Sequence, residues 1–507
     1  MGFELVWLKR DLRWEDHAPL ACAAAQGPIR VMYVVEPEFW QQPDASLQHL
    51  AFIRESLQDM HAAFQQVSGA VEVFHGDILD VLTSMWRQTR FERLYSHEET
   101  GNAFTHRRDL AVAGWCREHG VVWREAPQFG VVRGLKDRDR WQKAWESHMA
   151  AARSQPGPLR FWRPYPQHEL NLETPGGLEH DPPQRQRGGR RRAIAVIEDF
   201  LHRRSNSYRG GISSPLLAPN ACSRLSVYIA YGCISMREVV QLTRAELRDA
   251  PGSSRRRAGL RSFLSRLYWH CHFIQKLESE PEIEWRNMHR GYDGLREADF
   301  SQKRFLALQA GRTGWPMVDA CVAMLRETGW LNFRMRAMLV SVAAYPLWLH
   351  WQPVGQWLAR QFLDYEPGIH WSQMQMQSGT TGINTTRVYN PIKQAQDHDP
   401  EGRFVRQWLP HLRRVSDNWI FEPWQMPSHL RDPQGQGGVD DEIVPPIVDL
   451  ALATREAKRR LYERRHKPEV RAGQQAVVER HASRQGWRGE ARGQRRVEPD
   501  RQLTLDI

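Results

Sequence analysis

Arginines, carboxylates and aromatic residues recur inside helix-like apolar spacing between Gly314 and Leu412. This stretch contains GWPMVDACVAMLRETGWLNFRMR, LDYEPGIHW and YNPIKQAQDHDPEGRFVRQWLPHL. A plain protein core would bury leucine and valine at such positions, because unpaired charges are costly to bury. The pattern therefore predicts a helical region that encloses a large, flat ligand with polar edges.

The elements that precede this region read as α/β. Short β-rich runs alternate with longer helical stretches, such as Ser46–Gln65 and Ile78–Thr89. This alternation predicts a doubly wound parallel sheet with helices on both faces. No GxGxxG follows the first run, so a Rossmann dinucleotide site is not indicated. The predicted strands are Phe3–Leu8, Val31–Val35, Val71–Phe74, Arg93–Tyr95 and Val121–Trp123.

Changes in composition divide the chain into four parts. Residues 1–134 form the α/β domain, and residues 135–189, rich in Pro, Gly and charge, read as an interdomain connector. Residues 190–460 carry helical periodicity, with one apolar face running from Leu260 to Leu277. Residues 461–507 are basic and poor in apolar residues, so they are predicted to be a disordered tail. The fold class is α/β plus all-α.

The overall composition narrows the class of protein. A chain of 507 residues predicts two domains, and a net charge of +11 favours an anionic partner, with nucleic acid the leading candidate. The alternative is a basic tail on an ordinary enzyme. No signal peptide or long apolar run is evident, which predicts a cytoplasmic protein without membrane association. The six cysteines form no CxxC pair, so no metal site is predicted.

Several blocks, in order, resemble the photolyase and cryptochrome family. The resemblance spans nearly all of residues 1–430 and implies an α/β antenna domain followed by a helical FAD-binding domain. It implies a monomeric deoxyribodipyrimidine photolyase, a carbon–carbon lyase acting on damaged DNA. Repair would proceed by electron transfer from photoexcited reduced FAD to a cyclobutane pyrimidine dimer. The blocks are LVWLKRDLRWEDHAPL, ACSRLSVYIAYGCIS, LYWHCHFIQKL, GRTGWPMVDA, GWLNFRMRAM and YNPIKQ.

The resemblance also implies a set of cofactor-binding residues. An arginine with convergent hydroxyl or backbone donors suits the FAD phosphates, although ACSRLS also reads as a simple helix cap. Carboxylates suit the flavin ring and ribose, and the matching arginine would pair with the first of them; an ordinary buried ion pair is the alternative. The phosphate residues are Tyr208, Ser223, Arg224 and Leu225; the flavin-side residues are His270, Arg336, Asp364, Glu366 and His370.

Two cofactor positions depart from the family pattern. The family usually carries Asp where this chain has Glu366, and an Asn-rich segment where it has PGIHW. His370 therefore either tunes flavin protonation or is a structural histidine.

Trp269 matches the family tryptophan that stacks on the extruded lesion, although core packing is the alternative role. Arg266 and His270 replace a Glu and an Arg of common repair enzymes, and Asn332-Phe333 replaces His-Asn. These departures leave two alternatives open. One is a cryptochrome-like photoreceptor without repair activity, and the other is a six-four photolyase, which the missing paired histidines disfavour.

Light-driven chemistry in the family also uses a tryptophan relay and an antenna. Trp351 matches the middle relay member and Trp371 is a candidate for the proximal one, but EADFSQKRF lacks the surface tryptophan. HEETGNAFTHRRDLAV resembles the antenna region. His106 stands where folate binders have Glu, which argues against folate and leaves a second chromophore unidentified.

Basic residues near Trp269 predict contacts to DNA phosphates, which would give sequence-independent, salt-sensitive binding. A solvated charged face is the alternative. The candidates are Arg255, Arg256, Arg257, Arg266 and Arg334.

Overall fold

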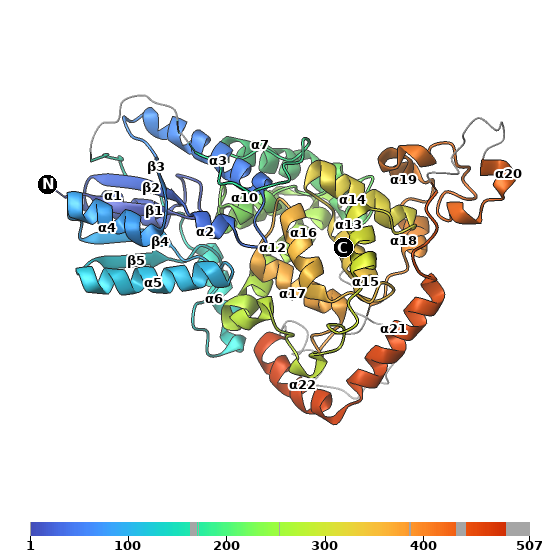
Figure 1. Cartoon of the computed structure of the whole chain (residues 1–507). Helices are drawn as coiled ribbons and strands as arrows, with labels where there is room; N and C mark the ends of the chain where they lie inside the picture. The colour runs from blue at the N-terminus through green and yellow to red at the C-terminus, as the bar shows by residue number, and fades with distance from the viewer. Residues whose placement is uncertain are drawn as a thin grey trace.

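A computed structural model describes residues 2–162, 170, 172–252, 254–384, 387–431 and 443–482. Figure 1 shows a sheet domain at the left, in blue and cyan, against a larger domain of helices at the right. No helix in these described ranges is long and apolar enough to cross a membrane.

The sheet has five parallel strands in the order β3-β2-β1-β4-β5. The central strand β1 is buried along its whole length, as expected for a parallel strand covered on both faces. The predicted doubly wound sheet is confirmed. The strands are β1 (Glu4–Leu8), β2 (Ile29–Val35), β3 (Glu72–His75), β4 (Arg93–His97) and β5 (Val122–Ala126).

Helices cover both faces of this sheet because successive β1 side chains alternate between them. Val6 and Leu8 pack in the cluster that contains α1 and α3 residues, whereas Leu5 and Trp7 pack with α4 and α5. The helices of this domain are α1 (Ala18–Gln26), α2 (Pro37–Trp40), α3 (Leu47–Gln65), α4 (Ile78–Gln88) and α5 (Ala103–His119).

The helical domain is built around α12 (Arg255–Ser279), which packs against α8 (Ser205–Gly211) and α17 (Pro367–Ser378). Gly259 permits the close approach to α8, because a Cβ there would collide with the Ser205 carbonyl oxygen. The other helices that position the site are α7 (Arg190–Asp199), α10 (Ser226–Ala230), α11 (Met236–Asp249), α14 (Pro316–Thr328), α15 (Phe333–Ala344) and α16 (Trp351–Gln361). Peripheral helices are α9 (Ala218–Ala221), α13 (Gln302–Ala310), α18 (Pro391–His398), α19 (Arg403–Trp408) and α20 (Ser428–Arg431).

The two domains are joined through the segment that follows β1. The Leu12 amide donates to the Tyr231 carbonyl at 3.1 Å, and the buried Arg13 guanidinium donates to the Gly232 carbonyl at 3.1 Å. A cluster of two histidines around one carboxylate holds this segment in place. Asp11 Oδ2 lies 2.9 Å from His17 Nε2 and 2.7 Å from His97 Nδ1.

The structure differs from the sequence prediction at both regions of low periodicity. The connector contains a helix, α6 (Trp141–Ala150), with Trp141, Trp145 and Met149 buried. The tail prediction is wrong for its first part, because α21 (Leu450–Arg465) is followed by α22 (Pro468–His481). Val470, Val477 and His481 are buried on α22, so a few well-spaced anchors suffice where composition suggested disorder. Residues 483–507 lie outside the described residues.

Candidate functional site

A cavity of about 1550 Å³ lies in the helical domain between α8, α12, α15 and α17. Its walls combine aromatic faces, such as Phe273, Trp330 and Phe362, with charged groups. This mixture agrees with the expectation of a flat ligand with polar edges. The sequence-predicted site residues that line the cavity are Tyr208, Ser223, Arg224, Arg266, Trp269, His270, Arg336, Asp364, Glu366 and His370.

One wall carries a bidentate ion pair. Arg336 Nη1 and Nη2 each donate to Asp364 carboxylate oxygens at 2.9 Å, and the guanidinium lies 4.2 Å from the Phe362 ring centroid. Burial raises the pKa of Asp364, but the Arg336 charge and hydrogen bonds, together with Ser226 and Arg224, outweigh burial and hold that pKa below its ordinary value. The carboxylate is therefore ionised and its arginine is held in one orientation.

Arg224 is a second cation in the cavity wall, and it is not part of the ion pair between Arg336 and Asp364. Its guanidinium lies 3.9 Å from the Trp330 ring centroid, and within the described ranges no carboxylate forms an ion pair with it. Burial lowers the pKa of Arg224 to about 10. Its φ of 58° lies in the left-handed region, which a non-glycine residue rarely adopts outside constrained sites. A charged, partly desolvated arginine of this kind suits a phosphate.

Glu366 connects the cavity to the α/β domain. Its Oε2 lies 3.4 Å from Arg10 Nη1, and Arg10 Nη2 donates to the Tyr365 carbonyl at 2.8 Å. The other oxygen, Oε1, is buried without a hydrogen-bond partner among the described residues. Burial raises the pKa of Glu366 to about 7. A ligand hydroxyl or ring N–H would satisfy this oxygen.

Replacing Glu366 by glutamine is expected to make the stability of the cofactor-free protein less dependent on pH. The pKa is about 7 when folded against 4.5 as the ordinary value, so the unfolded chain ionises first. The free energy of unfolding therefore falls by up to about 3 kcal/mol as pH rises from about 4.5 to 7. Burial is the main cause of the raised pKa, the Arg10 charge opposes it, and the Glu99 charge adds to it. Urea unfolding at several pH values measures this slope. Equal slopes in wild type and Glu366→Gln would contradict the assignment.

Two histidines in the cavity wall are neutral. Burial lowers the pKa of His370 to about 4 and that of His270 to about 3. His370 Nε2 lies 2.9 Å from the Gly355 carbonyl and donates to it, which fixes the tautomer. Both therefore present uncharged rings to the cavity.

Trp269 lies partly buried at the cavity, with its ring centroid 5.8 Å from that of Phe273. Arg266 lies one helical turn earlier on α12 and hydrogen-bonds the Tyr208 side chain. An aromatic face and a cation thus share one side of the cavity.

The two predicted relay tryptophans are buried next to the cavity but do not line it. Trp351 and Trp371 are buried with ring centroids 5.9 Å apart, and Trp371 follows the wall residue His370. The Trp351 indole donates to Asn287 Oδ1 at 2.8 Å.

Several other predicted residues lie away from the cavity. Leu225 is fully buried and serves the core. Arg256 pairs with Glu246, and Arg257 donates to the Leu247 and Ala250 carbonyls at 2.7 and 2.9 Å. Both guanidiniums hold the end of α11, and DNA contact by Arg256 and Arg257 stays a prediction. Arg255 and Arg334 are respectively exposed and half-buried.

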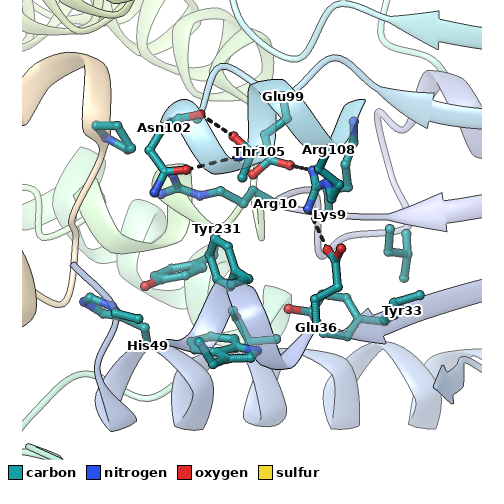
Figure 2. Close-up of a pocket in the computed structure, with 18 of the residues that line it drawn as sticks. Lys9, Arg10, Tyr33, Glu36, His49, Glu99, Asn102, Thr105, Arg108 and Tyr231 are labelled. Atoms are coloured by element: carbon teal, nitrogen blue, oxygen red, sulfur yellow. Dashed lines mark hydrogen bonds and ion pairs between the residues drawn. The ribbon is translucent and has the colours of Figure 1, made fainter. Parts of the chain in front are cut away.

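A second, smaller crevice lies at the carboxyl ends of β1, β2 and β4, the topological switch point of the sheet. Figure 2 shows Glu36 and Glu99 approaching Arg108 from two sides. Arg108 also contacts Asp109, which in turn accepts from Lys9 at 2.9 Å. Tyr365 lines both this crevice and the larger cavity, so the two spaces share a wall.

Sequence reasoning missed three residues that help to build the larger cavity. Arg10, from the α/β domain, contacts the wall residue Glu366. Ser226 hydrogen-bonds Asp364, and Trp330 supports Arg224. Each lies inside one of the blocks that resemble the family, so those blocks were the signal that could have found them.

Comparisons with known proteins agree with this architecture. The family described as DNA photolyase matches residues 4–132, and the FAD binding domain of DNA photolyase matches residues 263–463. The deoxyribodipyrimidine photo-lyase of Vibrio cholerae is 26% identical over 84% of this chain and 93% of its own. Cryptochrome DASH of Gloeobacter violaceus is 25% identical over 88% and 93%, respectively. A class III photolyase structure from Agrobacterium tumefaciens aligns with a TM-score of 0.76 and 21% identity, covering 92% of this chain and 98% of that one.

A parallel α/β domain joined to a helical FAD-binding domain defines a two-domain flavoprotein. The chain belongs to the photolyase and cryptochrome family, whose two models together cover about two thirds of it. FAD is its cofactor, and the residues present fit that group. Arg224 offers a cation, while Asn332 Oδ1 and Glu366 Oε1 are buried acceptors without partners in the described part of the chain.

Proposed function

We propose that this protein is a light-driven DNA repair enzyme that splits cyclobutane pyrimidine dimers. The observation that carries the proposal is that Trp269 and Arg266 line the same cavity as the charged groups suited to FAD. An extruded pyrimidine dimer that stacks on Trp269 would therefore lie next to the cofactor.

Each group in the cavity has a binding or orienting role in this proposal. Reduced FAD, when bound and excited by light, supplies the electron that opens the dimer. Arg224, with Tyr208 and Ser223 nearby, holds the phosphates, while Asp364 and Glu366 accept from the ribose or ring. Arg336 keeps positive charge near the ring, which favours the reduced, anionic form. Trp351 and Trp371 carry electrons toward the cavity.

Reversal of a defined lesion tests this function. Chemically reduced holoprotein is mixed with an oligonucleotide that carries one cyclobutane thymine dimer, and dimer content is compared under blue light and in darkness. Loss of the dimer only under light supports the proposal. No loss with FAD bound and reduced would refute it, and a parallel six-four substrate tests the other lesion class.

A cryptochrome-like photoreceptor is the second candidate. It is favoured by Arg266 and the uncharged His270, which stand where common repair enzymes carry Glu and Arg. Light-induced absorbance changes of the flavin without dimer reversal would select this candidate.

The crevice at the switch point is the proposed site of a second chromophore. Its lining includes Trp7, Tyr33 and Trp40, which suit a planar ring. The charges of Lys9 and Arg108 in this lining are paired with Asp109 and Glu36. The shared Tyr365 wall would place such a chromophore close to FAD.

A further inference from the structure

A hollow of about 630 Å³ lies where α21 turns into α22, apart from both cavities described above. Figure 1 shows these two helices, in red, forming the lower edge of the helical domain. The hollow is lined by Tyr292, Gly382, Arg465, His466, Val470, Arg471 and Gln474.

The cations at this hollow lack acidic partners. Within the described ranges, neither Arg465 nor Arg471 forms an ion pair, and both are exposed. The acids closest in sequence do not neutralise them. Glu463 pairs with Arg459 at 2.5 Å, and Glu469 stands two positions from Arg471, a helical spacing at which side chains do not face each other. The hollow therefore has uncompensated positive charge.

A buried hydroxyl-bearing side chain supplies the second observation. Tyr292 is 3% exposed and lines the hollow, yet its hydroxyl has no hydrogen-bond partner among the described residues. Burial raises its pKa, so the hydroxyl remains a proton donor. Two guanidiniums and a phenol donor thus line one hollow, and donors of this kind suit a tetrahedral oxyanion such as phosphate.

The position of the hollow indicates which phosphate would occupy it. Gln377 lines the FAD cavity, and Gly382, five residues later, lines the hollow. Five residues span at most about 17 Å, which corresponds to about five base pairs of duplex DNA. The hollow therefore lies within the length of a few base pairs of one wall of the cavity.

We propose that Tyr292, Arg465 and Arg471 bind a backbone phosphate of the DNA strand, a few nucleotides from the base held in the FAD cavity. This inference rests on the proposed DNA-repair function and extends it. The site provides affinity and register, and it takes no part in the chemistry.

The salt dependence of DNA binding tests this proposal. Holoprotein variant Arg465→Ala/Arg471→Ala is compared with wild type on a duplex bearing one thymine dimer. The slope of log affinity against log salt is expected to fall by about 1 for each DNA phosphate that the variant no longer neutralises. Tyr292→Phe is expected to weaken binding without changing the slope, because it removes a donor and no charge. Light-driven reversal at saturating DNA is expected to remain unchanged in both.

A matched variant controls for net charge. Arg455→Ala/Lys458→Ala removes two exposed cations of α21 that do not line the hollow, and it is expected to keep the wild-type slope. Equal salt slopes in wild type and all variants, or an equal fall in slope in both double variants, would overturn this inference and leave the proposed repair function untouched. Absence of DNA binding by wild type would overturn the proposed function together with it. Competition by inorganic phosphate at constant ionic strength, with unchanged slopes, would assign the site to free phosphate and overturn the DNA assignment.

Discussion

Replacing Asp364 by alanine is expected to destabilise the cofactor-free protein by about 3 kcal/mol and to reduce FAD content. The change leaves Arg336 in the cavity wall without its bidentate partner. It also removes the negative charge nearest to Arg224, so two cations would face each other without compensation. Urea unfolding of the apoprotein and flavin absorbance per protein measure the two effects.

A double variant makes this prediction specific. Because an uncompensated charge causes most of the loss, Asp364→Ala/Arg336→Met is expected to recover stability relative to Asp364→Ala. Asp397→Asn removes the acid of an exposed helical pair with Lys393 and is expected to cost less than about 0.5 kcal/mol. If the double variant were no more stable than Asp364→Ala, the electrostatic explanation would be wrong.

Replacing Trp269 by alanine is expected to lower affinity for dimer-containing DNA by about 10- to 100-fold, because base–aromatic stacking contributes about 1–3 kcal/mol per base. Affinity for undamaged duplex is expected to stay the same, since Trp269 lines the cavity and undamaged bases stay stacked in the duplex outside it. Fluorescence anisotropy with both duplexes measures the difference.

Two variants separate stacking from loss of bulk. Trp269→Phe keeps an aromatic face and is expected to retain most of the discrimination. Trp285→Ala changes an indole that is 41% exposed and does not line the FAD cavity. This variant is expected to discriminate between damaged and undamaged DNA as well as wild type does. Equal weakening toward damaged and undamaged DNA in Trp269→Ala would contradict lesion stacking.

The regular elements were predictable because their periodicity is local. The predicted apolar face from Leu260 to Leu277 lies within α12, because its residues recur at helical spacing along one segment. The helix α22 was not predictable in this way. Its burial depends on two valines and on His481, which lies 2.6 Å from Glu280 of a distant segment.

Some residues of the candidate site could likewise be predicted from the sequence, and others could not. Residues inside continuous blocks, such as Arg224, Trp269 and Arg336, line one cavity. The local partners of Arg256 and Arg257 were not predictable, because a run of charge does not reveal its partners. Only the packing of α12 against α11 shows that backbone carbonyls and Glu246 occupy them.

The ion pair between Arg10 and Glu366 has a consequence for how the protein is made. The arginine is synthesised before its partner, which follows some 350 residues later. At about 5–20 residues per second, synthesis separates the two by roughly 20 to 70 seconds. During that interval the nascent α/β domain carries an arginine without its partner, and the flavin site lacks one wall. This contact between the two domains is therefore completed only after Glu366 has been synthesised.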